Sequence, residues 1–368
     1  MNSGFLRTDG LSAGYGRKIV LSGAEITAER GKITTLIGPN GCGKSTLLKT
    51  AARQLQPLSG TVFIDGRDLR QTSPNELARK LSILLTERIS PELMTCRDVV
   101  ESGRYPYTGR LGILSEADRA AVDEAMELTS TAELSGVDFS RISDGQRQRV
   151  MLARAISQQP ELLILDEPTS FLDIRHKLEL LNTLKKLVRE KNVAVLMSLH
   201  ELDLAERVSD RIVTISGGKI GRIGAPEKIF SGGCISSLYG IDEACFCESS
   251  GCAELEKPSG APRVFVISGG GRCGGVFRRL QREGIPFAAG MIPENDIDYP
   301  VAYALAAEVL SYPAFGEVPK SALQRGFALI SSCEYTLCCP GSVGRLNTDN
   351  SALLAHADKL GKLRGAGS

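Results

Sequence analysis

The stretch of sequence that decides the fold is Gly38-Pro39-Asn40-Gly41-Cys42-Gly43-Lys44-Ser45-Thr46. It matches the phosphate-binding pattern in which two glycines bracket four residues and Lys-Ser follow. The apolar run Ile33–Ile37 before it predicts a buried strand, and apolar residues at helical spacing after it predict a helix. Such a loop turns backbone N–H groups toward a polyphosphate, aided by the partial positive charge of the helix N-terminus. We therefore expect all nine residues to line a nucleotide site, although a chance Gly-rich turn would also give the pattern.

The catalytic groups are expected at the carboxyl edge of one parallel sheet. Lys44 is expected to reach the β and γ phosphates, and the Ser45 hydroxyl to bind Mg²⁺. An unbroken apolar run, Leu162–Leu165, predicts a buried strand that ends in Asp166 and Glu167. Because ligands bind beyond the carboxyl ends of such strands, Asp166 is expected to hold Mg²⁺ and Glu167 to polarise the attacking water. A helix cap or a solvated turn is the alternative for this acid pair alone.

Three further segments are candidates for the same site. His200 follows a second apolar run, Val193–Ser198, and is expected to meet the γ-phosphate unless it is a plain polar strand end. Tyr15 lies on a Gly-containing turn, where its ring either stacks on a purine or is an ordinary turn residue. The polar loop Arg141–Arg149 opens a helix predicted to run to about Gln158, and a helix N-terminus favours an anion.

The composition is that of a soluble chain with two or three domains. Its 368 residues are enough for separate hydrophobic cores. The formal net charge is +1, from 44 basic and 43 acidic residues, so no overall field attracts nucleic acid or anionic lipid. The longest apolar windows are shorter than the roughly 18 residues of a membrane span. No basic region followed by an apolar core opens the sequence, so we expect a cytoplasmic location and thiols rather than disulfides.

These segments, in this order, resemble the ATP-binding subunit of ABC transporters over about residues 5–255. The matching segments are the Walker A loop (Gly38–Thr46), the signature loop (Ser143-Asp144-Gly145-Gln146), the Walker B strand with its catalytic Glu (Leu162–Glu167), the D-loop (Ser170–Asp173), the switch histidine (His200) and, in place of the adenine-stacking aromatic, Tyr15. The segment Val100–Tyr107 resembles the branch that imports iron-siderophores, haem and vitamin B12.

The resemblance implies an ATPase that uses ATP and Mg²⁺ and works as a head-to-tail homodimer. Each ATP would be held by Lys44, Ser45 and Thr46 of one copy. The other motif residues expected at the nucleotide are Ser143 and Gly145, which would cover the ATP held by the second copy, together with Gln146 and Asp173. The implied partners are a polytopic membrane permease and, indirectly, a substrate-binding protein, with the chain peripheral on the inner face of the cell membrane. The alternatives are a soluble ABC-type ATPase without a membrane partner and an ATPase that serves a ligand-sensing C-terminal domain.

Two positions depart from the family pattern. Glu87 stands where the family has a Gln; it can still present an oxygen to Mg²⁺ or water, but it adds negative charge beside Asp166 and Glu167. Asp144 replaces the first glycine of the signature loop. A carboxylate there would be repelled by the γ-phosphate, so we expect Asp144 to turn to solvent or to a basic neighbour such as Arg147.

The expected fold is an α/β P-loop ATPase domain with an antiparallel β layer and a helical insertion, followed by a smaller Rossmann-like α/β domain. The predicted bounds are 1–256 for the ATPase domain, with a helical subdomain at about 88–158, then a linker at 257–262 and a C-terminal domain at 263–368. A helix at Glu116–Leu128, opened by Ser115, lies in the helical subdomain. We assign the C-terminal domain a regulatory role as a working hypothesis.

Alternating elements predict a parallel sheet in the C-terminal domain. The expected elements are strand Val264–Ile267, helix Gly275–Glu283, strand Phe287–Ala289, helices Val301–Leu310 and Lys320–Ile330, strand Tyr335–Leu337 and helix Ser351–Leu360. Gly269–Gly274 fits the dinucleotide-loop pattern, but no acid ends the second strand, so a structural turn is preferred over phosphate binding. Eight cysteines lie from Cys234 onward; their spacing favours buried or free thiols over a metal centre.

Overall fold

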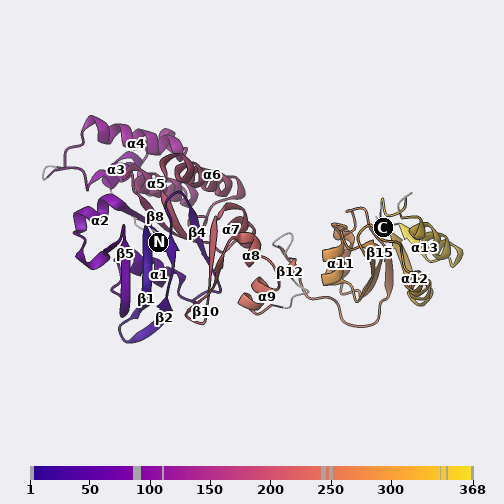
Figure 1. Ribbon diagram of the computed structural model, residues 1–368. Coiled ribbons are helices and arrows are strands. Elements are labelled where there is room, and N and C mark those ends of the chain that lie inside the picture. Colours follow the sequence, from indigo (N-terminus) through magenta and orange to yellow (C-terminus); the bar gives the residue numbers. More distant parts are fainter. Residues whose placement is uncertain are drawn as a thin grey trace. The chain divides into compact units, whose positions relative to one another are not determined.

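The computed structural model describes residues 4–85, 93–109, 112–241, 246–247, 252–339, 341–344 and 347–365. The chain divides into two compact units, residues 1–239 and 240–368 (Figure 1). This division falls earlier in the chain than the predicted boundary at 256, and the predicted domain bounds stay a prediction. Each unit is described by itself below.

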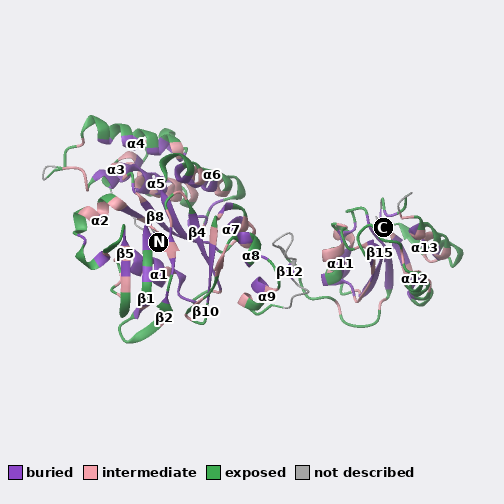
Figure 2. Cartoon of the chain, viewed as in Figure 1, coloured by how far each residue is buried: buried purple, intermediate pink, exposed green. Residues whose placement is uncertain are grey.

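A six-stranded sheet forms the centre of the first unit, with strand order β11-β10-β4-β9-β8-β7. Its strands are β4 (Ile33–Ile37), β7 (Leu81–Leu84), β8 (Leu162–Asp166), β9 (Ala194–Ser198), β10 (Arg211–Ser216) and β11 (Lys219–Gly224). All neighbours are parallel except β10 and β11. Every residue of β4, β8 and β9 is buried, and Figure 2 shows β4 and β8 in purple. Strands covered on both faces read as continuous apolar runs, and for this reason the sequence identified them.

An antiparallel layer packs against the central sheet. Its strands are β1 (Leu6–Tyr15), β2 (Lys18–Ala24), β3 (Thr27–Ala28), β5 (Ser59–Ile64) and β6 (Arg67–Asp68). One buried cluster joins the two sheets, since it holds Leu6 and Leu21 from this layer, Leu36 and Leu196 from the central sheet, and Leu47 from the helix that follows β4. The predicted antiparallel β layer is confirmed.

Helices cover the central sheet and form a separate bundle beside it. The helices of the first unit are α1 (Lys44–Ala51), α2 (Pro74–Lys80), α3 (Cys96–Glu101), α4 (Glu116–Leu128), α5 (Asp144–Ser157), α6 (Ile174–Lys191), α7 (Leu202–Val208), α8 (Pro226–Ile229) and α9 (Cys234–Tyr239). Helices α3 and α4 both pack on α5 and make up the predicted helical insertion. Buried Arg104 ties it together, because its guanidinium binds the Asp118 carboxylate on α4 and the Ser157 carbonyl at the end of α5, each at 2.8 Å.

The second unit is a doubly wound parallel sheet with strand order β16-β15-β14-β17-β18. Its elements are β14 (Val264–Ile267), α10 (Gly274–Arg282), β15 (Phe287–Pro293), α11 (Tyr299–Leu305), β16 (Glu308–Tyr312), α12 (Lys320–Ser332), β17 (Tyr335–Cys338), α13 (Thr348–Lys359) and β18 (Leu363–Gly365), preceded by the short pair β12 (Phe246–Cys247) and β13 (Cys252–Ala253). Helices α10 and α11 share a core with one face of the sheet, and α12 and α13 with the other. The predicted Rossmann-like class is confirmed.

The predicted helix Val301–Leu310 is wrong. Helix α11 ends at Leu305, Ala306 has extended dihedral angles (φ −82°, ψ 146°), and β16 begins at Glu308. The alanine-rich run favours a helix locally, but pairing of β16 with β15 buries Leu310 and Tyr312, and this tertiary packing overrides the local preference. Strand β18 was not predicted.

Candidate nucleotide site

A cavity of about 400 Å³ lies at the carboxyl edge of the central sheet of the first unit. Its lining brings together many of the residues expected at the nucleotide: Tyr15, Asn40, Gly41, Gly43, Lys44, Ser45, Thr46, Glu167 and His200, with Val20 in addition. These residues come from β1, β2 and the loops and helices that follow β4, β8 and β9. Parallel strands present their carboxyl ends at one edge, so segments more than 100 residues apart in sequence meet there.

The loop between β4 and α1 has the conformation that its glycines permit. Gly43, the residue before α1, has a φ of +112°, which a residue with a side chain rarely adopts. A Cβ atom on Gly38 would lie 2.0 Å from the Ile215 carbonyl oxygen, so only glycine fits between β4 and β10. The Lys44 ammonium is buried and donates to the carbonyl oxygens of Gly38 (2.7 Å) and Pro39 (3.2 Å). The loop's own carbonyls thus hold the cation that is expected to bind phosphate.

Three loop residues lie outside the cavity lining. Gly38 and Pro39 contribute the carbonyls that hold Lys44, and the Cys42 side chain is buried. Burial raises the pKa of the Cys42 thiol, against the opposing effect of the Lys44 ammonium. At neutral pH this thiol is therefore a small, protonated core residue. The expected contact of these three residues with nucleotide stays a prediction.

Ser198 links the two acids that end β8, and the sequence did not reveal it. Its hydroxyl donates to the Asp166 carboxylate (2.7 Å) and accepts from the backbone N–H of Glu167 (2.9 Å). Asp166 is 1% exposed, so this hydroxyl is its partner in the protein interior. Ser198 is the last residue of β9 and pairs directly with Asp166 across the sheet. Aligning the ends of the two apolar runs would have found this position.

Glu167 and His200 form a pair that faces the cavity. The His200 Nε2 and Glu167 Oε1 atoms are 2.6 Å apart, and the Ser170 hydroxyl donates to Glu167 Oε2 at 3.3 Å. Glu167 has a φ of +50°, a conformation that costs a residue with a side chain about 1–3 kcal/mol and that concentrates at functional sites. His200 thus holds the Glu167 carboxylate at the cavity, where this carboxylate can accept a proton or a hydrogen bond from a water molecule.

The signature-loop residues and Asp173 do not line this cavity. Ser143 caps α5 through mutual hydrogen bonds with Gln146: the Gln146 N–H donates to the Ser143 hydroxyl (3.2 Å), and the Ser143 N–H donates to the Gln146 amide oxygen (2.9 Å). Gly145 lies beside the D-loop, where an added Cβ would contact the Phe171 carbonyl oxygen at 3.6 Å. Asp173 caps α6, and the hydrogen bond from the His176 N–H lowers the pKa of its carboxyl.

Asp144 turns to a basic neighbour. Its carboxylate accepts a hydrogen bond from the Arg147 guanidinium at 2.8 Å, within the same first turn of α5. The prediction made for this departure from the family pattern is confirmed. Glu87, the other departure and an expected metal ligand, lies outside the described residues.

One of the expected Mg²⁺ ligands lines the cavity, and a second, Asp166, is buried next to the lining residue Glu167. The Ser45 hydroxyl belongs to the lining, and the Asp166 carboxylate ends the strand that leads to Glu167. Mg²⁺ in phosphate-binding sites is usually held by one or two such protein oxygens, together with water and phosphate, so this donor set fits. Within the ranges that the structure describes, no group of three or more His, Cys, Asp and Glu side chains is arranged as a metal site.

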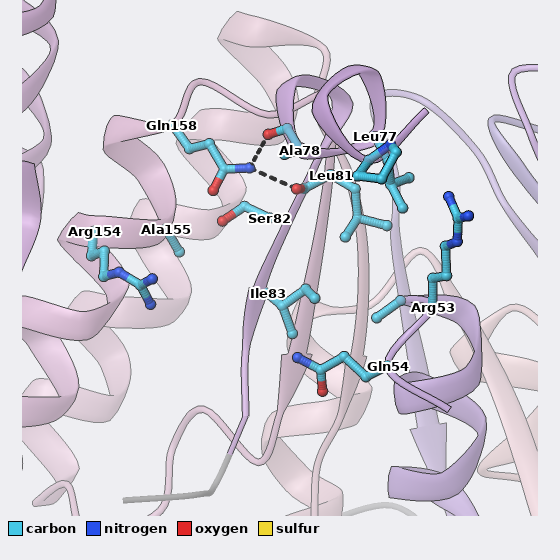
Figure 3. Close-up of a pocket in the computed structure, with 12 residues that line it drawn as sticks. Arg53, Gln54, Leu77, Ala78, Leu81, Ser82, Ile83, Arg154, Ala155 and Gln158 are labelled. Carbon is cyan, nitrogen blue, oxygen red and sulfur yellow. Dashed lines mark hydrogen bonds between the residues drawn. The ribbon is translucent and has the colours of Figure 1, made fainter. Parts of the chain in front are cut away.

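A second cavity of the first unit, of about 510 Å³, lies between the end of α1, the α2–β7 segment and α5. Figure 3 shows its lining, with Gln54 and Ile83 on one side and Arg154 on the other. The Gln158 amide at the end of α5 donates to the carbonyl oxygens of Leu81 (2.7 Å) and Ala78, which joins the helical insertion to the α2–β7 segment. Residues of the central sheet and of the helical insertion therefore both line this cavity.

In the second unit, carboxylates occupy the Gly-rich loop after β14. The Gly270 N–H donates to Asp296 (2.7 Å), and the N–H groups of Cys273 and Gly274, at the start of α10, donate to Asp298 (3.0 and 3.1 Å). Asp298 is buried. A pyrophosphate would need the N–H groups that these acids already bind, which supports the structural turn over phosphate binding.

The described cysteines are buried or partly buried free thiols. Burial raises the pKa of Cys333 to about 11, and a hydrogen bond with Cys273, together with burial, raises the pKa of Cys339. Neutral thiols of this kind are poor metal ligands and poor nucleophiles. Cys245 lies outside the described residues, and the side chains of Cys247 and Cys252 are not described.

Fold and site together define an ABC-type ATPase. The family model described as ABC transporter matches residues 21–170, and a second model, the MJ0874 family, matches residues 287–363. An uncharacterized ABC transporter ATP-binding protein of Methanocaldococcus jannaschii, MJ0873, is 42% identical over 276 residues, which is 75% of this chain and 95% of that protein. The chain belongs to the ATP-binding subunits of ABC transporters, which are ATPases that use ATP with Mg²⁺.

Several relatives have names that state a cargo, including the following two. The achromobactin transport ATP-binding protein CbrD of Dickeya dadantii is 39% identical, over 63% of this chain and 86% of its own. The cobalamin import ATP-binding protein BtuD of Halobacterium salinarum is 32% identical, over 80% of this chain and 76% of its own.

Solved structures of ABC cassettes share the fold. A structure of the ATP-binding subunit of an ABC transporter is 27% identical with a TM-score of 0.56, and covers 65% of this chain and 95% of its own. The dimeric structure of the cassette MJ0796 is 25% identical with a TM-score of 0.55, and covers 60% of this chain and 98% of its own. No helix in the described ranges has the length and apolar character to cross a membrane.

Proposed function

We propose that this chain powers a membrane importer of iron-siderophore, haem or cobalamin-type cargo by binding and hydrolysing ATP as a head-to-tail homodimer. The observation that carries the proposal is one cavity lined by Lys44, Ser45, Glu167 and His200, with the signature loop outside it. The relatives named for achromobactin transport and cobalamin import support the cargo class. Cargo selectivity belongs to the membrane and binding-protein partners.

Binding and activation of ATP follow from the side chains of the cavity. Lys44 exchanges its bonds to the Gly38 and Pro39 carbonyls for bonds to the β and γ phosphates. Glu167, fixed by His200, accepts a hydrogen bond from the attacking water and polarises it. The Tyr15 ring is assigned to adenine, and the backbone of 38–43 and the Thr46 hydroxyl are assigned to phosphate. The oxygens of Ser45 and Asp166 are assigned to Mg²⁺, which supplies positive charge at the phosphates when bound.

A second copy of the chain completes the site in this proposal. Ser143, Gly145 and Gln146 lie at the N-terminus of α5, outside their own cavity, where they can cover the ATP of a partner copy. Ile174, next to Asp173, is 77% exposed, so a partner copy that covers it would bury apolar surface. The structural relative MJ0796 has been solved as a dimer, which supports this arrangement.

The cavity in Figure 3 is the proposed docking place of the membrane permease. A cytoplasmic segment of the permease that enters it would contact the central sheet through Ile83 and the helical insertion through Arg154. Closure of the dimer changes the position of α5, so a segment held there would be moved. The chain would thus lie at the inner face of the membrane without entering it.

The test is co-purification from native membranes with the full chain carrying Glu167→Gln, in the presence of ATP. Loss of the water-activating carboxylate holds the ATP-bound dimer, so we expect a polytopic membrane protein to co-purify. Its sequence would give the cargo class. Recovery of soluble partners alone would contradict the importer and favour a soluble ABC-type ATPase.

Gln54→Trp in the same background tests the docking place. Gln54 lines the cavity in Figure 3, and an indole there would fill it. We expect the variant to lose the membrane protein and keep ATP binding. Gln56→Trp, at an exposed position outside the lining, is the matched control and should keep both. Equal recovery with the two variants would place the docking surface elsewhere.

A further inference from the structure

Tyr239, the last residue of α9, contacts the phosphate-binding loop. Its hydroxyl accepts a hydrogen bond from the Gly38 backbone N–H at 3.2 Å, across a separation of 201 residues in the chain. Burial raises the pKa of the Tyr239 phenol, so it remains neutral and keeps its hydrogen-bonding form at physiological pH. No motif of the nucleotide site contains this tyrosine.

Gly38 is fixed on both sides of its Cα atom. Its N–H is bound by Tyr239, and its carbonyl oxygen accepts the bond from the Lys44 ammonium at 2.7 Å. A Cβ on Gly38 would approach the Ile215 oxygen to 2.0 Å and the Cys42 sulfur to 3.0 Å, so little space surrounds this residue. A change at the Gly38 N–H therefore reaches Lys44 through a single residue.

We propose that Tyr239 is a positioning residue for ATP binding, which acts by holding Gly38 so that the loop presents Lys44 to the phosphates. This inference rests on the proposed role of Lys44 and adds a residue from the C-terminal end of the first unit. Tyr239 does not line the cavity, so it acts through the loop and not on the nucleotide.

The test is steady-state ATPase kinetics of the full chain with Tyr239→Phe, which removes the hydroxyl and keeps the ring. One hydrogen bond is worth a factor of about two to ten, so we expect KM for ATP to rise by about that factor, with kcat within twofold. Tyr107→Phe is the matched control, because the Tyr107 hydroxyl also forms hydrogen bonds with the backbone, to the carbonyl oxygens of Gln158 (3.0 Å) and Arg79 (3.5 Å), away from the nucleotide site. An unchanged KM, or a lower kcat at unchanged KM as expected from loss of folded protein, overturns the proposal.

A second readout does not depend on activity. Cys42 belongs to the same loop and its side chain is buried, so its alkylation rate, followed by mass spectrometry of the peptide that contains it, reports loop opening. We expect faster alkylation of Cys42 in Tyr239→Phe than in Tyr107→Phe. A raised KM without faster alkylation would overturn the assignment of the effect to the loop. Lys44→Ala serves as reference: if it leaves ATP binding intact, the proposed function fails and not this inference alone.

Discussion

The two Gly-rich loops of this chain have the same local plan and opposite surroundings. Each follows a fully buried parallel strand, β4 or β14, and leads into a helix, α1 or α10. The loop after β4 ends in Lys44, whose ammonium lies at a cavity of about 400 Å³. The loop after β14 has its N–H groups bound by Asp296 and Asp298. Glycine spacing thus sets a backbone shape, and the charge of the neighbouring side chain decides whether a phosphate can use it.

Acidic residues stand near both loops, and what holds them differs. In the first unit, Ser198 and His200 bind the carboxylates of Asp166 and Glu167. In the second unit, the loop itself binds the acids. The first arrangement keeps the loop available for an anion, whereas the second closes it with the protein's own carboxylates.

Glu167→Gln should have the largest effect. The amide cannot act as a base, so we expect kcat to fall by a factor of about 10²–10⁴ with ATP affinity retained. Single-turnover hydrolysis and equilibrium ATP binding measure the two quantities. Glu190→Gln, an exposed residue of α6, is the control. Turnover near that of the control would mean that Glu167 is not the base that polarises the attacking water. The residues at the first loop would then be shown to bind ATP but not to catalyse its hydrolysis.

Lys44→Ala and Arg272→Ala compare the loops directly. Loss of the Lys44 ammonium removes the cation of the first loop, and we expect ATP affinity to fall by about a hundredfold or more, from lost charge-assisted hydrogen bonds to two phosphates. Arg272→Ala, in the second loop, should leave ATP affinity unchanged. Binding of ATP by calorimetry to the full chain with Glu167→Gln checks both. If Arg272→Ala weakens or removes a fraction of ATP binding, the second loop is also a nucleotide site and the comparison fails.

The sequence predicted the first loop because local chemistry and pattern agree there. The continuous apolar runs marked β4, β8 and β9, and Ser115 marked the start of α4 at Glu116, where its hydroxyl and Asp118 form a reciprocal cap. Such signals lie within a few residues of the structure that they specify.

The features that the sequence did not reveal depend on contacts across long separations. The hydroxyl of Ser198 meets Asp166 only because β8 and β9 are neighbours in register, and Tyr239 meets Gly38 across 201 residues. The sequence indicated only that Asp296 and Asp298 are acids on a loop. In the fold, the turn after β15 places them against the loop after β14. The start of β16 was predicted as the end of a helix, because the alanines before it favour a helix locally and its pairing with β15 is a tertiary contact.

Asp298→Asn tests the closed loop of the second unit. Loss of the charge weakens two buried hydrogen bonds, so we expect local stability to fall by about 1–3 kcal/mol. Hydrogen exchange of peptides from 264–282 measures it, and it should quicken there and not in the first unit. Asp358→Asn, exposed on α13, is the control. Exchange as slow as in the control would mean that the carboxylate does not close this loop.

Ser198→Ala should have the smallest effect. It tests whether the Ser198 hydroxyl holds Asp166 and Glu167 away from the phosphate-binding loop after β4. The change removes a hydroxyl that binds a buried carboxylate and the Glu167 N–H, so we expect kcat to fall by about tenfold. Because Asp166 is the proposed Mg²⁺ ligand, the Mg²⁺ concentration for half-maximal activity should rise as well, whereas KM for ATP at saturating Mg²⁺ should not. Ser216→Ala, at the exposed end of β10, is the control. A tenfold loss of kcat together with a shifted Mg²⁺ dependence would show that Ser198, at the end of β9, holds Asp166 and Glu167 in position. Activity and Mg²⁺ dependence equal to the control would mean that His200 and the backbone hold the acid pair without Ser198.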